Sequence, residues 1–385
     1  MTASFDISFA KIPTPPEAEA LRAEVREFLR VALKDRTSAE KAESWNGYDP
    51  AFSRAIGARG WLAMTWPKQY GGHERSALER YVVSEEMLAA GAPVSAHWIA
   101  DRQSGPAILR YGTEAQRREI LPRIARGECF FGIGMSEPDS GSDLASVRTR
   151  AVETADGYVV NGTKLWTSGA HHAHYIILFC KTDGGADDRH GGASQFLVDM
   201  KTPGIEVRPV YALTGEHHFN EVVFRDCFLP KDALLGKRGD GWAQVMSELA
   251  FERSGPERFL SSFQVVVELL HRLGPAPDRA SAAAIGRIVA RIAVLRRMSR
   301  SVAGMLQAKQ DPGLQAAIVK DLGAVLEQEI PEIARVIASV EPDITSADGL
   351  EAALAYTIQH APSFSLRGGT REILRGIIAR GLGMR

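Results

Sequence analysis

The sequence predicts an α+β protein in which a helical region comes first, a β-barrel-like region follows, and a four-helix bundle ends the chain. Apolar residues recur at helical spacing before residue 128, with the period of strands between 129 and 236, and at helical spacing again from 237 onward. The predicted domains are therefore residues 17–128, 129–236 and 237–385, preceded by a loose, proline-rich arm over 1–16.

Length and composition exclude several classes of protein. The 385-residue chain is long enough for two or three domains with large cores. Its formal charge of −1 gives no basic surface of the kind that nucleic-acid-binding domains carry, and 45% apolar with 24% charged residues is typical of globular proteins. No apolar run approaches the roughly 20 residues that a membrane span requires. The first residues lack a basic segment followed by an apolar one, so we expect no signal peptide and a cytoplasmic protein.

Cysteine and histidine usage gives no sign of a metal site. Cys129, Cys180 and Cys227 are odd in number and far apart, which fits a reducing compartment. The pairs His171-His172 and His217-His218 lack the i,i+4 spacing of helical metal ligands and have no acid cluster nearby. We therefore expect no bound metal.

The first helical region contains five helical patterns. They cover residues 17–30, 50–59, 76–91, 101–112 and 114–126. Thr113-Glu-Ala-Gln116 has the form of a capping box, which predicts the start of the last of these helices. The loop 61–72 is punctuated by aromatic residues, proline and glycine, and is predicted to be a packed connector.

The middle region alternates strand patterns with turn residues. The strand patterns begin at Tyr158, Tyr175, Gln195, Ile205 and Glu221. Asp156-Gly157 and Asn161-Gly162 predict turns, and the Gly- and Asp-rich segment 183–192 predicts an exposed loop.

The final region returns to long helical patterns. They cover residues 240–253, 257–273, 279–309, 313–339, 348–360 and 370–381. Gly274-Pro-Ala-Pro277 and Glu341-Pro-Asp343 separate them, and their length suits a four-helix bundle.

Two segments of the middle region have the composition of a ligand site. The first, residues 131–143, contains Gly-Met-Ser-Glu-Pro-Asp-Ser-Gly-Ser-Asp, and the second is Lys164-Leu-Trp-Thr-Ser-Gly169. Small residues leave backbone N–H groups and hydroxyls accessible, which suits close approach to a flat or anionic ligand. An ordinary turn is the simpler interpretation of each segment taken alone.

Several motifs together resemble the acyl-CoA dehydrogenases. Trp66-Pro-Lys-Gln-Tyr-Gly-Gly72 and Gly105-Pro-Ala-Ile-Leu-Arg-Tyr-Gly-Thr-Glu-Ala-Gln116 have the form of that family's N-terminal helical domain, and the two segments above have the form of its flavin-binding middle domain. The resemblance implies the family's fold and FAD as cofactor. It also implies removal of a proton from the acyl α-carbon of a CoA thioester, while the β-hydrogen leaves as hydride to flavin N5, which gives the trans-2-enoyl-CoA.

The resemblance assigns most of the cofactor contacts to the middle domain. Met135, Ser136 and Ser142 would line the flavin and acyl-CoA side, with Ser142 counted as substrate-binding. Trp166 would pack on the isoalloxazine, and Thr167 and Ser168 would make polar contacts at its pyrimidine edge. Thr370, in the C-terminal motif, is also counted as cofactor-binding. The simpler alternatives are a core tryptophan and ordinary turn serines.

The catalytic base departs from the commonest family pattern. Most members carry it in a C-terminal Glu-Gly-Thr motif, but here the run is Arg367-Gly-Gly-Thr370, so Gly368 stands where the glutamate would be. A glycine cannot abstract a proton, although its N–H can donate to the thioester oxygen. A minority branch places the base one residue before an arginine on the first helix of the C-terminal domain.

In this chain that position reads Phe-Glu-Arg, with Glu252 as the implied base and Arg253 as the residue that holds the CoA part. Enclosure would raise the pKa of such a carboxyl towards working pH. Glu252 as a solvated helix acid, Glu248 or another acid as base, and no base at all remain open.

A second departure concerns the far end of the cofactor. The family's Arg-x-x-Phe-Gly and Gln-x-x-Gly-Gly runs, which reach the neighbour's FAD in the symmetric dimer, are not recognisable; Arg272 could replace the arginine, but no Phe-Gly follows it. The chain is thus either a homodimer or homotetramer, or the base-bearing subunit of a heterotetramer with a second acyl-CoA dehydrogenase-like chain.

The implied electron acceptor is an electron-transfer flavoprotein, and branched, cyclic or unusual acyl groups are plausible substrates. A non-catalytic or partner-dependent subunit, and a flavin monooxygenase on the same fold, are the alternative functions.

Overall fold

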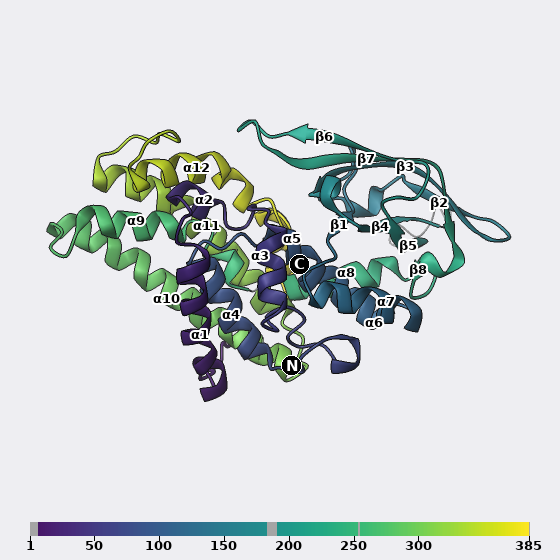
Figure 1. Cartoon of the computed structure of the whole chain (residues 1–385), viewed down its shortest axis with the longest axis horizontal. Coiled ribbons are helices and arrows are strands. Elements are labelled where there is room, and N and C mark those ends of the chain that lie inside the picture. The colour runs from purple at the N-terminus through teal and green to yellow at the C-terminus, as the bar shows by residue number, and fades with distance from the viewer. Residues whose placement is uncertain (1–6, 183–190, 253–254, 385) are drawn as a thin grey trace. The chain divides into compact units, whose positions relative to one another are not determined.

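The structure, a computed structural model, describes residues 7–182, 191–252 and 255–384, and at 247–252 it describes the backbone only. The chain divides into two compact units. One contains Met1–Tyr48, Arg75–Val94 and Ala250–Arg385, and the other contains Asp49–Glu74 and Ser95–Leu249. Figure 1 shows the first as helical and the second as a sheet accompanied by helices.

Helices come first, strands follow and helices end the chain, in the order that the sequence predicts. The helices are α1 Pro16–Ala32, α2 Ser38–Glu43, α3 Pro50–Gly57, α4 Ala77–Ala89, α5 Ser95–Ile99, α6 Gly105–Tyr111, α7 Glu114–Ala125, α8 Gly241–Glu252, α9 Phe263–Leu273, α10 Arg279–Gln307, α11 Gly313–Ala338, α12 Gly349–Phe364 and α13 Arg371–Gly381. The strands are β1 Phe131–Gly134, β2 Arg150–Glu153, β3 Gly157–Ser168, β4 Tyr175–Lys181, β5 Ala193–Asp199, β6 Ile205–Tyr211, β7 His217–Pro230 and β8 Leu234–Leu235.

One sheet of eight strands organises the second unit. Its order is β6-β7-β3-β2-β4-β5-β8, and β1 pairs in parallel with β4. β4 is buried at five successive positions, because its sequence Tyr-Ile-Ile-Leu-Phe-Cys-Lys offers apolar side chains to both faces of the sheet. Figure 1 shows β6 and β7 as a long paired ribbon at one end of this sheet.

Helices of the same unit cover one part of the sheet. A single buried cluster contains Trp66 from the loop 61–72, Ile108 of α6, Leu121 of α7, and Phe131 and Ile177 of β1 and β4. The capping box is confirmed, since Thr113 accepts a hydrogen bond from the backbone of Gln116 and the Gln116 side chain accepts one in return.

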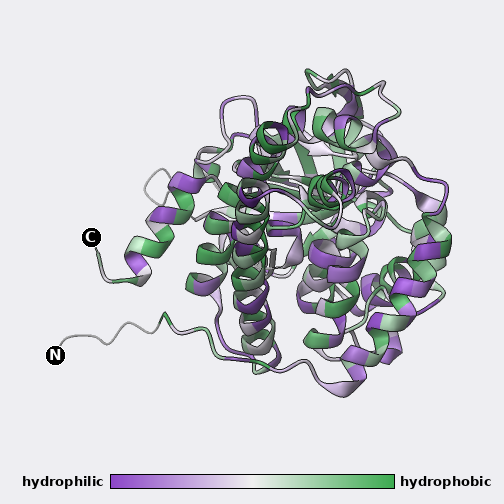
Figure 2. Cartoon of the chain, turned by 90° about the vertical axis from the view of Figure 1, so that its left-hand side faces the viewer, coloured by the Kyte–Doolittle hydropathy of each residue, from purple (hydrophilic) through white to green (hydrophobic). Residues whose placement is uncertain are grey.

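Packed helices form the other unit. α1 packs on α4, α4 on α10, α10 on α11, and α11 on α9, α12 and α13. In Figure 2 these helices carry hydrophobic and hydrophilic bands, the pattern expected of helices that bury one face. The predicted four-helix bundle and the helical, β, helical order are therefore confirmed.

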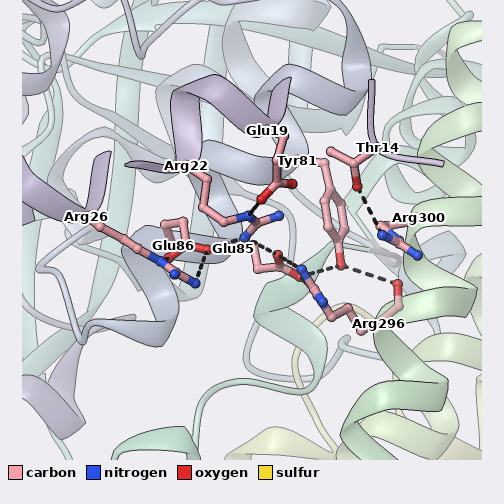
Figure 3. A network of polar contacts seen from close by, with 9 residues as sticks. All are labelled: Thr14, Glu19, Arg22, Arg26, Tyr81, Glu85, Glu86, Arg296 and Arg300. Atoms are coloured by element: carbon pink, nitrogen blue, oxygen red, sulfur yellow. Dashed lines mark hydrogen bonds and ion pairs between the residues drawn. The ribbon is translucent and has the colours of Figure 1, made fainter. Parts of the chain in front are cut away.

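A buried polar network joins three of these helices. Figure 3 shows Arg22 of α1 and Arg296 of α10 converging on Glu85 of α4, with Glu86 beside them. Thr14, which precedes α1, accepts a hydrogen bond of 3.0 Å from Arg300.

Three expectations about local structure are wrong. The turn expected at Asn161-Gly162 does not form, because both residues lie within β3, whose pairing with β7 is irregular between Val160 and Gly162. The helix expected over 257–273 begins only at Phe263, because Pro256–Arg258 forms a 3-10 turn whose Glu257 and Arg258 side chains are buried. The segment that starts at Phe131 is not wholly a turn, since its first four residues pair with β4 as a strand.

Candidate active site

The two segments singled out in the middle region meet in the structure. Nζ of Lys164 on β3 lies 2.8 Å from Oε1 of Glu137 and donates to the carbonyl of Met135 at 2.9 Å. Glu137 also accepts hydrogen bonds from the backbone of Arg148 and Thr149. The segment after β1 is thereby fixed to the end of β3 by a buried ion pair.

The charges of this pair depend on each other. Burial alone would raise the pKa of Glu137, but the Lys164 ammonium and the hydrogen bonds lower it below its ordinary value. Burial lowers the pKa of Lys164, and Glu137 counteracts that effect. Both groups are needed, because either charge alone would be buried without a partner.

Strand β3 contains an irregularity at Trp166. Lys164 pairs with Val222 and Thr167 with Asn220, so β3 has one residue more than β7 between these pairs. Trp166 has φ +64°, the left-handed region that bulky residues rarely adopt. Its indole is 55% exposed and packs edge-on against Phe219 at 5.8 Å between ring centroids. The structure therefore keeps a strained tryptophan at the surface of this unit.

The remaining residues predicted to contact cofactor or substrate in this region surround Trp166 or the loop after β1. Met135 and Ser136 are half-buried, and the Ser136 carbonyl accepts a hydrogen bond of 2.9 Å from the N–H of Leu165. Ser168 is half-buried and Ser142 is exposed. Thr167 is buried in the sheet, and its hydroxyl has no hydrogen-bond partner among the described residues.

Three functional candidates were missed from the sequence, namely Glu137, Lys164 and Asn220. A lysine inside an apolar strand pattern is a usable signal, because full burial of Lys164 requires a partner. Asn220 lies in a strand pattern too, and its side chain donates to the Thr167 carbonyl at 3.0 Å.

The surroundings of these segments leave room for a flat cofactor. A β-carbon on Gly141 or on Gly169 would meet no atom within 4 Å among the described residues. The exposed indole, the unpartnered Thr167 hydroxyl and these two open positions fit a planar ring with polar edges. The residues present thus fit a flavin.

Gly368, in the other unit, lies over a group of buried ionic side chains. Its φ is +68°, and Gly369 follows with φ +100°. Arg258 lies against it and also over the Trp45 ring, at 5.5 Å from the ring centroid. The Arg367 guanidinium also lies over the Trp45 ring, 4.7 Å from the ring centroid.

Glu327 on α11 completes this group. It accepts a hydrogen bond of 2.8 Å from the N–H of Ser261 and lies 3.7 Å from Nη2 of Arg367. Burial raises the pKa of Glu327 and lowers the pKa of Arg367 to about 10. Gly368 and Gly369 therefore lie beside a buried group of side chains that carries charges of both signs.

The other predicted residues have varied outcomes. Arg253 and the side chains of Glu248 and Glu252 lie outside the described residues, although the backbone of α8 extends to Glu252. Thr370 caps α13 by accepting a hydrogen bond from the N–H of Ile373. Arg272 pairs with Asp348 at 2.6 Å.

No group of three or more His, Cys, Asp or Glu side chains within the described ranges is arranged to hold a metal ion. His171 and His217 do come together, with ring centroids 3.8 Å apart, but as stacked rings. Among the described residues we also find no helix whose length and apolar character would let it cross a membrane.

Comparison with family models gives three matches in chain order. The chain matches the acyl-CoA dehydrogenase N-terminal domain over residues 15–128, the middle domain over 132–227 and the C-terminal domain over 239–383.

Individual proteins agree with this result. The chain is 33% identical over 378 residues to the acyl-CoA dehydrogenase IpdE1 of Mycobacterium tuberculosis, covering 94% of this chain and 96% of that relative. It is 38% identical over 260 residues to FadE29 of the same organism, covering 66% of each. The match therefore spans slightly less than two thirds of FadE29 but nearly all of IpdE1. The solved structure of the Tcur3481-Tcur3483 steroid ACAD is similar, with a TM-score of 0.85 and 28% identity, covering 97% of this chain and 99% of that one.

Proposed function

Because the chain belongs to the acyl-CoA dehydrogenase family, we propose that it converts an acyl-CoA thioester to the trans-2-enoyl-CoA with FAD as cofactor. Bound FAD supplies the hydride acceptor, its N5 atom. The observation that carries the proposal is the strained, half-exposed Trp166, which the buried Lys164–Glu137 pair fixes beside the loop after β1.

The middle-domain residues bind and orient the cofactor. Trp166 provides a flat wall, and the polar atoms of Met135, Ser136, Thr167 and Ser168 contact the ring edge without adding charge. The Thr167 side chain is buried, so its hydroxyl would approach the ring edge from inside the sheet. Ser142, being exposed, contacts the acyl-CoA.

Glu252 removes the α-proton. It ends α8, and Arg253 follows it directly, where it holds the CoA part. The absence of a side chain at Gly368 leaves Glu252 as the base, while the Gly368 N–H donates to the thioester oxygen and stabilises the charge that develops there. Thr370, which caps α13, is also assigned to cofactor binding.

The partner is a second acyl-CoA dehydrogenase-like chain. The sequence lacks both runs that reach a neighbour's FAD, and Arg272, the candidate replacement, is engaged by Asp348. The similar Tcur3481-Tcur3483 assembly carries two names and is called a steroid ACAD. We therefore place this chain as the base-bearing subunit of a heterotetramer that acts on a bulky polycyclic acyl-CoA and passes electrons to an electron-transfer flavoprotein.

The deciding experiment compares Glu252→Gln with Glu248→Gln, which removes the alternative carboxylate one helical turn earlier. Each protein, produced with its genomic neighbour, is mixed anaerobically with a panel of acyl-CoA thioesters while the flavin absorbance is followed. Glu252→Gln should lower the bleaching rate by at least about a hundredfold, and Glu248→Gln by less than about tenfold, because general acid–base catalysis contributes roughly 10²–10⁴. Full bleaching in Glu252→Gln excludes Glu252 as base.

The same measurement separates the alternative functions. Bleaching that appears only with a partner and survives both substitutions indicates a non-catalytic subunit. Oxygen consumption with a hydroxylated product indicates a monooxygenase on this fold.

A further inference from the structure

The conformation of Trp166 needs an explanation that its own contacts do not supply. A left-handed backbone is unfavourable for an L-residue, and a half-exposed indole recovers little of that cost by packing. Such a conformation persists only where neighbouring atoms impose it. The hydrogen bonds of the residues before and after Trp166 identify those atoms.

Trp166 lies between two backbone anchors. On its N-terminal side, the N–H of Leu165 leaves the sheet and donates to the carbonyl of Ser136 at 2.9 Å. On its C-terminal side, the carbonyl of Thr167 accepts a hydrogen bond of 3.0 Å from Nδ2 of Asn220. The first anchor belongs to the loop after β1. The second is a single side chain, which adds to the backbone pairing of Thr167 with Asn220 and of Ser168 with Phe219.

Asn220 is fixed in one orientation. It is fully buried, and since the Thr167 carbonyl is an acceptor only, the amide nitrogen must face it. The amide oxygen then faces Nδ1 of His171 at 3.1 Å and Nε2 of His217 at 2.8 Å. Both ring nitrogens must therefore carry a proton and donate to Asn220.

The two imidazoles form a rigid support for this amide. Although His171 is exposed, partial desolvation of its ring, followed by the neighbouring His172 and His217, lowers its pKa to about 4, so near pH 7 the ring is neutral with its proton on Nδ1. The rings of His171 and His217 stack at 20°. Asn220 thus makes three hydrogen bonds, two of which fix it and one of which fixes β3.

We propose that Asn220 is a positioning residue for the flavin-binding wall, because it holds the Thr167 carbonyl and thereby keeps Trp166 and Ser168 in the conformation that meets the ring. The proposal rests on the proposed function only in treating Trp166 as that wall. It gives His171 and His217 a role other than metal binding.

The test compares Asn220→Asp with a matched control on the same two strands. Asn220→Asp keeps the size and the two acceptor contacts, but it replaces the donor to Thr167 with an oxygen. Asn161→Ala removes a similar cross-strand contact, between Asn161 and Asp226, at the far end of β3 and β7. A second variant, His217→Phe, keeps a flat ring and removes one N–H that holds Asn220.

Two measurements are made on each protein. Amide hydrogen exchange in FAD-free protein follows residues 163–172, with 157–162 as an internal reference. In Asn220→Asp, exchange at 165–169 should rise at least about tenfold while the reference is unchanged, and the Kd for FAD should rise at least about tenfold. His217→Phe should give smaller changes in the same direction. Asn161→Ala should change neither the exchange at 165–169 nor the Kd for FAD.

The outcomes separate the two hypotheses. Unchanged exchange at 165–169 in Asn220→Asp overturns the positioning role. Faster exchange with an unchanged Kd for FAD supports the anchor but overturns Trp166 as the flavin wall. If the purified wild-type protein binds no FAD, the proposed function fails, while the exchange comparison still decides the role of Asn220.

Discussion

The guanidinium of Arg258 lies against Gly368 so closely that a β-carbon on residue 368 would be 3.0 Å from Nη2 and 3.2 Å from Cζ. Arg258 is buried, and the Trp45 ring restricts its movement on another side. The local packing and the left-handed φ therefore both favour glycine at 368.

Gly368→Ala should destabilise the helical unit. The left-handed φ costs an alanine about 1–2 kcal/mol, and the contact with Arg258 adds to that cost. Gly376→Ala is the matched control, since a β-carbon there meets only Nη1 of Arg380 at 3.7 Å and the residue is helical. The control should stabilise by up to about 1 kcal/mol. Urea unfolding of both variants measures the difference, and an equal effect at the two glycines would contradict the role of Arg258.

A carboxylate returned to position 368 should not replace Glu252. In Glu252→Gln/Gly368→Glu, the new side chain begins beside the Arg258 guanidinium, which would keep the pKa of its carboxyl low and weaken it as a base. We expect the rate of flavin bleaching to stay within about tenfold of that of Glu252→Gln. Adding Arg258→Gln serves as the control. Recovery to the wild-type rate in the double variant would show that Arg258 does not disfavour a base there.

Breaking the buried ion pair Lys164–Glu137 should lower the free energy of unfolding far more than breaking an exposed pair. Lys164→Met leaves Glu137 buried without its partner, which should cost about 3–5 kcal/mol. Arg208→Met removes a half-exposed arginine that pairs with Glu206 and Glu221 in the same unit, and should cost less than about 1 kcal/mol. Urea unfolding compares the two. The prediction fails if Lys164→Met/Glu137→Gln is no more stable than Lys164→Met alone.

The order and the ends of the long helices could be predicted from local sequence patterns. Hydrophobic periodicity predicts α10 and α11 within two residues of their observed ends, because each helix buries a continuous apolar face. The turn before α9 was missed, since Glu257 and Arg258 continue a helical pattern in the sequence although both side chains are buried in a 3-10 turn.

The site was predictable in part. Trp166 and the segment after β1 were found from their sequence motifs, whereas the anchors at Lys164 and Asn220 depend on strand register. Register joins residues that are distant in the chain, such as Thr167 and Asn220, and one irregularity in β3 decides which side chains meet. The role of Glu252 stays a prediction.

The network in Figure 3 should make the stability of the helical unit depend on pH through Glu85. Burial would raise the pKa of Glu85, but bonds from Arg296 at 2.7 Å and Arg22 at 2.9 Å lower it below its ordinary value of 4.5. Since the pKa is lower in the folded state, the stabilising contribution is complete above about pH 4.5 and is lost as the pH falls through the folded-state value.

Glu85→Gln should accordingly flatten the dependence of the free energy of unfolding on pH below about 4.5. Near pH 7 it should destabilise the unit by about 1–3 kcal/mol, because Arg22 and the half-exposed Arg296 lose a buried counter-charge while Arg22 keeps Glu86. Glu27→Gln is the control, since Glu27 pairs with Arg30 at the surface of α1. Urea unfolding between pH 3 and 7 measures both variants. A slope in Glu85→Gln as steep as that of the wild type would show that another carboxylate controls the acid sensitivity of this unit.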